Sequence, residues 1–252
     1  MIEAKNISMY FGNTRVLENV SVHFEEGKTN LIIGQSGSGK TVLLKCLIGL
    51  YDPDEGEVMY DDIVFNKLSF SKKKAIRKKI GMMFQGGALF DSETVEQNVM
   101  YPLNMFTGMS LEEKKERVNF CLKHVNIVNA NHLYPSEISG GMQKRVALAR
   151  AIALNPEYLF CDEPNSGLDP KTAIVIDNLI KDITEKFNTT TIVNTHDMNS
   201  VMEIGQKVVF IFEGKKYWEG TNKEILYSDN QELNDFVFAN KIAQQLRDLK
   251  KK

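Results

Sequence analysis

The eight residues Gly34-Gln35-Ser36-Gly37-Ser38-Gly39-Lys40-Thr41 constrain the fold more than any other segment, because they fit the pattern G-x-x-x-x-G-K-[ST]. The apolar run 31–33 before them predicts a strand, and the apolar segment 41–50 after them predicts a buried helix. A glycine-rich loop at a helix N-terminus offers backbone N–H groups and a positive dipole end to an anion. This segment therefore predicts an α/β fold with a phosphate-binding loop.

The loop supplies most of the predicted nucleotide contacts. Lys40 is expected to reach the β- and γ-phosphates, and the Thr41 hydroxyl is expected to bind Mg²⁺. A chance Gly/Ser-rich turn is the alternative, and the strand and helix on its two sides argue against it. The residues assigned to nucleotide binding are Gly34, Ser36, Gly37, Ser38, Gly39, Lys40 and Thr41.

A second apolar run, 158–161, ends in Asp162 and Glu163. Ligands of α/β sheets bind at the carboxyl ends of strands, so Asp162 is suited to hold Mg²⁺. Glu163 is placed to orient or deprotonate the water that attacks the γ-phosphate. Taken alone, such a run is more typical of a strand capped by solvated charges, and it is the phosphate loop that favours the catalytic interpretation.

Composition excludes several classes of protein. The chain has 252 residues, 42% of them hydrophobic, which is typical of one large globular domain or two small ones. A net charge of -2 argues against a surface dedicated to nucleic acid. Three widely spaced cysteines suit a reducing compartment. We find neither a signal-peptide core nor an apolar run of ~20 residues, and we expect a cytosolic chain.

The chain alternates between strand and helix patterns. Alternating apolar residues at 20–24 predict a strand before the turn at 26–28, and 57–65 is strand-like. Apolar residues at helical spacing in 94–128 predict an inserted helical subdomain. Strands are expected again at 158–161, 190–193 and 208–212, the last followed by a hairpin at Glu213-Gly214.

Ser139-Gly140-Gly141 precedes a predicted helix, where Ser139 is placed as an N-cap. In this order, the phosphate loop, the SGG segment and Asp162-Glu163-Pro164 resemble the ATP-binding cassette (ABC) ATPases, whose signature is LSGGQ. The resemblance implies an α/β P-loop NTPase fold with a RecA-like core, an N-terminal antiparallel β subdomain and an inserted helical subdomain. The implied domains are the core at 1–90 and 155–225, the helical subdomain at 91–154 and a C-terminal helical extension at 226–252.

The resemblance also assigns residues that the pattern alone does not. Phe11 looks like the aromatic residue that stacks on adenine, and Gln85 like the loop glutamine that senses Mg²⁺ and faces the permease. Asp169 lies in the loop that passes the dimer interface, and His196 resembles the histidine that contacts the γ-phosphate. Taken singly, each residue is more typical of a structural role: Phe11 as a core or surface aromatic, Gln85 as a turn amide and His196 as a capping residue.

In this family the signature of one subunit completes the site over ATP held by the other, which implies a homodimer. Ser139, Gly140 and Gly141 would then meet the partner's γ-phosphate. Two residues depart from the family pattern. Met142 replaces the last Gln of the signature, and Asn165 replaces the Thr that usually follows Asp-Glu-Pro, which leaves local hydrogen bonding in question.

The segments 84–92 and 140–145 look most like the ATPases of bacterial Mla or MCE-type phospholipid transporters. That resemblance implies a peripheral ATPase on the cytoplasmic face of the bacterial inner membrane. Its implied partners are a membrane permease, MCE-type lipid-binding subunits and accessory subunits, and nucleic acid is not among them. The alternatives are an ATPase for amino acids, ions or peptides, and a soluble ABC ATPase acting on ribosomes or DNA. Two interpretations are open for the basic run 72–79, a contact with lipid headgroups or a solvated helix face. Two are also open for the tail with Phe238, Ile242, Leu246 and Leu249, which docks on a partner or packs on its own domain.

Overall fold

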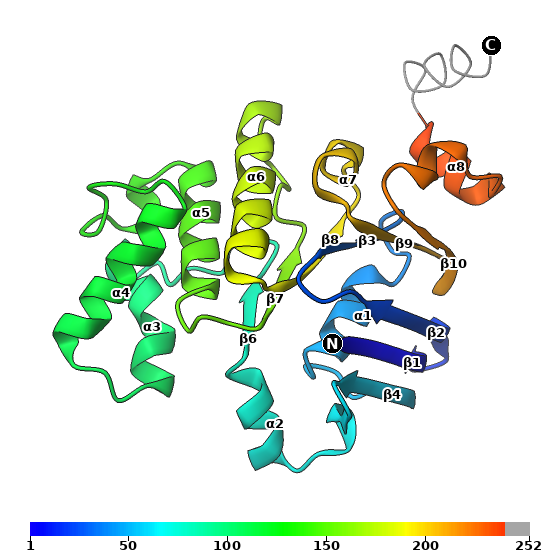
Figure 1. The fold of residues 1–252 in the computed structure, drawn as a ribbon, viewed down its shortest axis with the longest axis horizontal. Coiled ribbons are helices and arrows are strands. Elements are labelled where there is room, and N and C mark those ends of the chain that lie inside the picture. Colours follow the sequence, from blue (N-terminus) through cyan, green and yellow to red (C-terminus); the bar gives the residue numbers. More distant parts are fainter. Residues whose placement is uncertain (240–252) are drawn as a thin grey trace. The chain divides into compact units, whose positions relative to one another are not determined.

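A computed structural model describes residues 1–239 (Figure 1). These residues divide into two compact units. Unit 1 comprises Met1–Glu25, Thr29–Leu68 and the described residues from Asn194 onward. Unit 2 comprises Glu26–Lys28 and Ser69–Val193. Within residues 1–239, no helix is both long and apolar enough to cross a membrane.

The first sheet of unit 1 is antiparallel, with the strand order β2-β1-β4-β5. Alternate side chains of β2 are buried, as the 20–24 pattern predicts: Val20, Val22 and Phe24 face the core. The strand predicted over 57–65 is broken by a turn, because Asp61 adopts a positive φ of 52°. The strands are β1 (Ile2–Phe11), β2 (Thr14–Phe24), β4 (Glu55–Tyr60) and β5 (Ile63–Val64).

Three strands of the second sheet lie in unit 1, in the order β10-β9-β3. β3 (Thr29–Ile33) is buried along its whole length and runs parallel to β9 (Lys207–Phe212), which forms the predicted hairpin with β10 (Lys215–Gly220). The other elements of unit 1 are α1 (Lys40–Leu47), η1 (Phe65–Lys67), α7 (Met198–Ile204), η3 (Glu224–Tyr227) and α8 (Gln231–Val237). Phe238 of the predicted tail is buried after α8, and Ile242, Leu246 and Leu249 lie outside the described residues.

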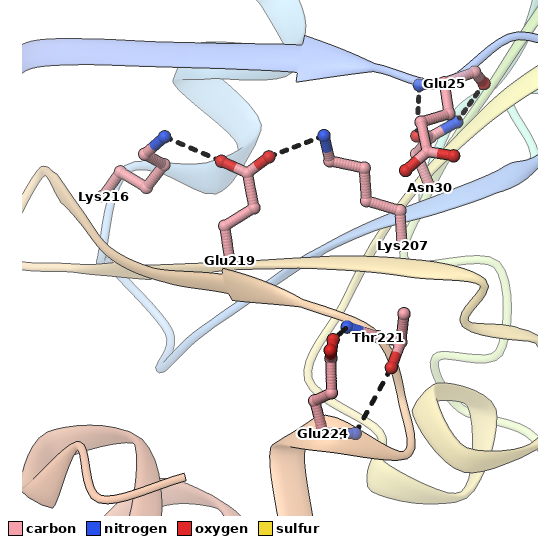
Figure 2. A network of polar contacts seen from close by, with 7 residues as sticks. All are labelled: Glu25, Asn30, Lys207, Lys216, Glu219, Thr221 and Glu224. Carbon is pink, nitrogen blue, oxygen red and sulfur yellow. Dashed lines mark hydrogen bonds and ion pairs between the residues drawn. The ribbon is translucent and has the colours of Figure 1, made fainter.

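A polar network fixes the β9–β10 pair (Figure 2). Glu219 on β10 forms one ion pair with the buried Lys207 on β9 (2.6 Å) and another with Lys216 (2.7 Å). Burial raises the pKa of Glu219, but the hydrogen bonds from the two lysines outweigh it and hold the pKa below its usual value. The edge strand is thus held to β9 by a carboxylate between two ammonium groups.

Unit 2 combines three strands with a group of helices (Figure 1). β6 (Ile80–Met83) pairs in parallel with β7 (Tyr158–Asp162), and β8 (Thr190–Thr195), whose last two residues belong to unit 1, is the next strand. The helices are α2 (Phe70–Arg77), α3 (Val95–Phe106), α4 (Leu111–His124), η2 (Pro135–Glu137), α5 (Gly140–Ala151) and α6 (Pro170–Phe187).

The helices α3, α4 and α5 pack on one another. Thr94 and Ser110 begin α3 and α4 with capping boxes, each closed by a side chain three residues later. Arg117 on α4 donates hydrogen bonds to the carbonyl oxygens of Ile152 and Ala153 (both 2.8 Å) just after α5. These bonds connect α4 to the turn that follows α5.

Candidate functional site

The predicted site residues are distributed over both units. Unit 1 holds Phe11, Gly34, Ser36, Gly37, Ser38, Gly39, Lys40, Thr41 and His196. Unit 2 holds Gln85, Ser139, Gly140, Gly141, Asp162, Glu163 and Asp169.

The phosphate loop runs from β3 into α1, as the sequence predicts. A Cβ on Gly34 would lie 2.1 Å from the carbonyl oxygen of Ile211, and a Cβ on Gly39 would lie 2.9 Å from that of Val16. Gly37 differs because nothing lies within 4 Å of its Cβ position, so only its left-handed φ of 81° favours glycine there. Two glycines therefore permit close packing, and the third permits a left-handed turn beside open space.

The ammonium of Lys40 lies over its own loop. Lys40 is 6% exposed, and its Nζ donates to the carbonyl oxygens of Gly34 (2.8 Å) and Gln35 (2.9 Å). Gly39 is the N-cap of α1 and offers no side-chain acceptor to the first helical turn. The hydroxyl of Ser38 is buried and, within the described residues, has no hydrogen-bond partner. Cationic and N–H donors thus converge on one short loop, which suits an anionic ligand.

Thr41, the first residue after Lys40, contacts a residue that the sequence analysis did not identify. The side chain of Asn194, at the end of β8, is fully buried, and its Nδ2 donates to Thr41 Oγ1 at 3.1 Å. The sequence contains one signal for this residue. A lone amide follows the run Thr191-Ile192-Val193, where a strand core normally continues with apolar residues.

Phe11 and His196 lie in unit 1, outside the phosphate loop. Phe11 is 45% exposed at the end of β1 and makes an edge-to-face contact with Tyr51, their ring centroids 5.5 Å apart. A core role for Phe11 is therefore wrong, while a stacking surface stays a prediction. His196 precedes α7, but the N-cap is Asp197, which accepts from the backbone of Asn199. The capping alternative for His196 is thus wrong as well.

In unit 2, β7 ends at Asp162, and the chain then turns sharply at Glu163. Asp162 is 5% exposed. Glu163 has a φ of 48°, a left-handed conformation that costs free energy for any residue except glycine and is frequent at functional sites. Asn165, which replaces the Thr that is usual in the family, forms a local hydrogen bond: its Nδ2 donates to the buried carboxylate of Asp177 at 2.8 Å. A buried polar pair thus anchors the turn that carries Glu163.

The signature segment forms the start of α5. Ser139 is its N-cap, as predicted, and accepts a hydrogen bond from the backbone N–H of Met142 at 3.3 Å. Gly140 has open space around its Cβ position, whereas a Cβ on Gly141 would lie 2.6 Å from Thr172 Cγ2. Only Gly140 of this pair is therefore open to an approaching ligand on its Cβ side. A side chain at position 141 would force Thr172 on α6 or the start of α5 to shift.

Asp169 is the N-cap of α6. Its carboxylate accepts from the backbone N–H groups of Lys171 (3.0 Å) and Thr172 (3.1 Å) and from the Thr172 hydroxyl (2.5 Å). The hydroxyl and backbone bonds from Thr172 are the main reason that the pKa of Asp169 lies below its usual value.

Gln85 lies in an exposed turn after β6, closed by a hydrogen bond from the backbone N–H of Gly87 to Phe84 O (2.8 Å). Lys144 on α5 is 7% exposed and donates to the backbone carbonyl oxygen of Gln85. Sequence reasoning missed this role of Lys144, since the spacing of the motif alone does not indicate which way a lysine at position 144 turns.

The predicted metal ligands are all oxygen donors: the hydroxyl of Thr41, the side-chain amide of Gln85 and the carboxylate of Asp162. Hydroxyl and carboxylate oxygens, completed by phosphate oxygens and water, suit Mg²⁺ rather than a transition metal. In the part of the chain from Met1 to Ala239, no group of three or more His, Cys, Asp or Glu side chains is placed to hold a metal ion.

Comparison with known proteins identifies the family. A family profile described as "ABC transporter" matches residues 17–166. The methionine import ATP-binding protein MetN of Clostridioides difficile is 39% identical over 237 residues, covering 94% of this chain and 74% of MetN. The intermembrane phospholipid transport system ATP-binding protein MlaF of Haemophilus influenzae is 38% identical over 237 residues, covering 94% of this chain and 90% of MlaF.

Solved structures agree with this assignment. The dimeric structure of the bacterial ABC transporter cassette MJ0796 matches with a TM-score of 0.81 at 37% identity, covering 88% of this chain and 99% of the other. The cbiO1 protein from Clostridium perfringens, part of the ABC transporter complex cbiONQ, matches with a TM-score of 0.84 at 25% identity, covering 100% and 98%. The chain belongs to the ABC transporter ATP-binding family and has its P-loop NTPase fold. It is an ATPase that binds ATP and serves as the ATPase subunit of an ABC transporter.

Proposed function

We propose that this ATPase powers phospholipid transport through a separate membrane permease and works as a homodimer at the cytoplasmic face of the bacterial inner membrane. The observation that carries its catalytic part is the phosphate loop, in which Lys40 is buried against the loop carbonyls and Gly34 and Gly39 have no room for a side chain. The identity with MlaF, a protein named for phospholipid transport, supports the choice of substrate.

We assign each residue a chemical role. The loop N–H groups and Lys40 hold the β- and γ-phosphates, and the exposed ring of Phe11 stacks on adenine. Thr41, Gln85 and Asp162 supply oxygen ligands to Mg²⁺, which neutralises charge on the phosphates when bound. Glu163 accepts a proton from the attacking water, and His196 donates a hydrogen bond to the γ-phosphate.

The signature segment provides the reason for a dimer. Ser139 caps a helix whose N-terminal end, beside the open Gly140, offers N–H donors and a positive dipole to the γ-phosphate of a partner copy. Asp169 lies in the loop that would pass the partner. The dimeric structure of the related MJ0796 cassette supports this arrangement.

The helical insertion carries a surface suited to a membrane permease. Around the end of α3 and the start of α4, several large apolar side chains are exposed, including Met105 at 58% and Leu111 at 54%. Exposed apolar groups gathered in one region are typical of a protein interface. The full set comprises Tyr101, Met105, Phe106, Met109 and Leu111.

The catalytic proposal is tested with Glu163→Gln, which retains the size of the side chain and removes its basicity. We expect ATP turnover to fall at least ~100-fold, as is typical for loss of a general base, while ATP affinity is retained and an ATP-bound dimer accumulates. The measurements are phosphate release and size-exclusion chromatography with ATP. Turnover equal to that of the unmodified protein would refute the assignment.

Methionine import is a second candidate, because MetN is as similar to this chain as MlaF. The chain should be purified with its permease from detergent-extracted membranes, and the co-purified molecules identified by mass spectrometry. The control is a Met105→Glu variant, which should release the permease. More phospholipid in the sample of the unmodified chain than in this control supports the proposal. Methionine-dependent stimulation of ATPase activity in proteoliposomes, or association with ribosomes or DNA and no permease, would contradict it.

A further inference from the structure

We propose that Asn194 is a positioning residue that orients the hydroxyl of Thr41 toward nucleotide-bound Mg²⁺. The inference rests on the proposed role of Thr41 as a metal ligand and adds a residue outside the motifs. Its basis is one contact inside unit 1, the hydrogen bond of 3.1 Å from Asn194 Nδ2 to Thr41 Oγ1.

The burial of Asn194 indicates that this contact has a purpose beyond packing. The residue is 0% exposed at the end of a strand in which every residue is buried. Transfer of a side-chain amide into such an environment costs free energy unless hydrogen bonds compensate for it, and an aliphatic residue would fill the same space without that cost. The amide therefore uses part of its hydrogen-bonding capacity on the phosphate loop.

The geometry of a hydroxyl group explains what the amide does. Thr41 Oγ1 has one proton and two lone pairs. The N–H of Asn194 engages one lone pair, which fixes the direction in which the other lone pair can meet a cation. Partners of this kind fix the orientation of metal ligands, and their removal typically lowers metal affinity. Asn194 should accordingly affect the metal-dependent part of nucleotide binding and leave the direct phosphate contacts of the loop unchanged.

The test compares the binding of a fluorescent ATP analogue in Mg²⁺ and in EDTA, using the full chain. For Asn194→Val we expect the affinity in Mg²⁺ to fall about tenfold, as for other partners of metal ligands, and the affinity in EDTA to stay within about twofold. Asn194→Ala, which introduces no new atoms, should give the same pattern and serves if the valine variant does not fold. Equal losses in Mg²⁺ and EDTA, or no loss in either, would overturn the proposal.

A double-mutant cycle tests whether the effect passes through Thr41. Thr41→Val keeps the shape of the side chain and removes the hydroxyl, so adding Asn194→Val to it should weaken Mg²⁺-dependent binding no further. Additive losses would overturn the proposal. Asn30→Val is the matched control, because Asn30 is also a fully buried strand amide of unit 1 but bonds to the backbone of Glu25 (Figure 2). It should lower the melting temperature and leave the ratio of Mg²⁺ to EDTA affinities unchanged.

The same data separate this inference from the proposed function. If the unmodified chain binds nucleotide equally well with and without Mg²⁺, or if Thr41→Val has no effect on binding in Mg²⁺, the role of Thr41 as metal ligand fails. If instead Mg²⁺ strengthens nucleotide binding to the unmodified chain and Thr41→Val weakens binding in Mg²⁺, the role of Thr41 stands. If Asn194→Val then binds like the unmodified chain, only the role of Asn194 fails.

Discussion

The ammonium group of Lys144 donates a hydrogen bond to the backbone carbonyl oxygen of Gln85 and makes a longer contact, 3.5 Å, with the hydroxyl of Ser166. One buried cation on α5 thus connects the loop after β6 to the loop after β7. Burial lowers the pKa of Lys144, while the negative charges of Glu163 and Asp162 act in the opposite direction. Lys144 therefore interacts electrostatically with the proposed general base, Glu163, and the proposed metal ligand, Asp162.

This relationship predicts that Lys144→Met lowers turnover without unfolding the protein. We expect kcat to fall about tenfold, equivalent to one hydrogen bond from a charged donor, because the Gln85 loop loses its tether. The melting temperature should change by less than about 5 °C, since removal of a buried charge offsets the lost bonds. Steady-state kinetics and thermal unfolding provide the measurements. Lys123→Met, an exposed lysine on α4, is the control and should retain normal kcat.

Sequence reasoning located the segments that carry chemistry better than it located the contacts between them. The strand and helix on the two sides of segment 34–39, the N-cap at Ser139 and the strand ending at Asp162 follow from local rules of spacing and capping, and the structure confirms each. The partners of Lys144 and Asn194 are distant in sequence, so no local pattern contains them. Asn194 leaves one signal in the sequence, an amide that follows an apolar run, whereas Lys144 lies between Gln143 and Arg145 and leaves none.

The turn at Asp61 shows that contacts distant in sequence also limit the prediction of the fold. Segment 57–65 has a strand-like alternation, but only tertiary context determines where a strand must reverse, and the chain does so through Asp61 at positive φ. Gly141 is a second example, because a glycine in a signature segment does not reveal whether it admits a ligand or a neighbouring helix.

The two kinds of glycine in the phosphate loop predict different costs of substitution. Gly34→Ala would place a Cβ 2.1 Å from a backbone oxygen at a φ of 150°, so we expect it to lower the melting temperature strongly or prevent folding. Gly37→Ala meets no atom within 4 Å and suffers only the left-handed backbone penalty of ~1–2 kcal/mol. Urea unfolding of both variants checks the order, and an equal or larger loss for Gly37→Ala would contradict it.

The buried cysteines predict a loss of stability at alkaline pH. The pKa of Cys46 is raised to about 12 and that of Cys121 to about 11, mainly because both thiols are buried. Burial also raises the pKa of Cys161. A raised pKa in the fold means that stability is complete below the pKa of the unfolded thiol and falls as pH rises above ~9. We expect up to ~1.4 kcal/mol per thiol to be lost for each pH unit in that range.

Urea unfolding at pH 8 and pH 10 measures this loss. Cys161→Ala should show a smaller decrease between the two pH values, because one of the three thiols is absent, although its stability at pH 8 is lower owing to the cavity. A decrease as large as that of the unmodified chain would show that Cys161 does not contribute.

The close contact between α5 and α6 predicts a rescue. Gly141→Ala would bring a Cβ within 2.6 Å of Thr172 Cγ2, so the start of α5 must shift, and we expect a loss of ~1–3 kcal/mol in unfolding free energy. Thr172→Ser removes that methyl group and retains the hydroxyl that bonds to Asp169. The double variant Gly141→Ala with Thr172→Ser should therefore recover most of the lost stability, which urea unfolding measures. Gly140→Ala, with open space at its Cβ position, is the control and should be tolerated. If Thr172→Ser gives no recovery, Gly141 is not required for the packing of these two helices, and a role in ligand approach becomes the better account of this glycine.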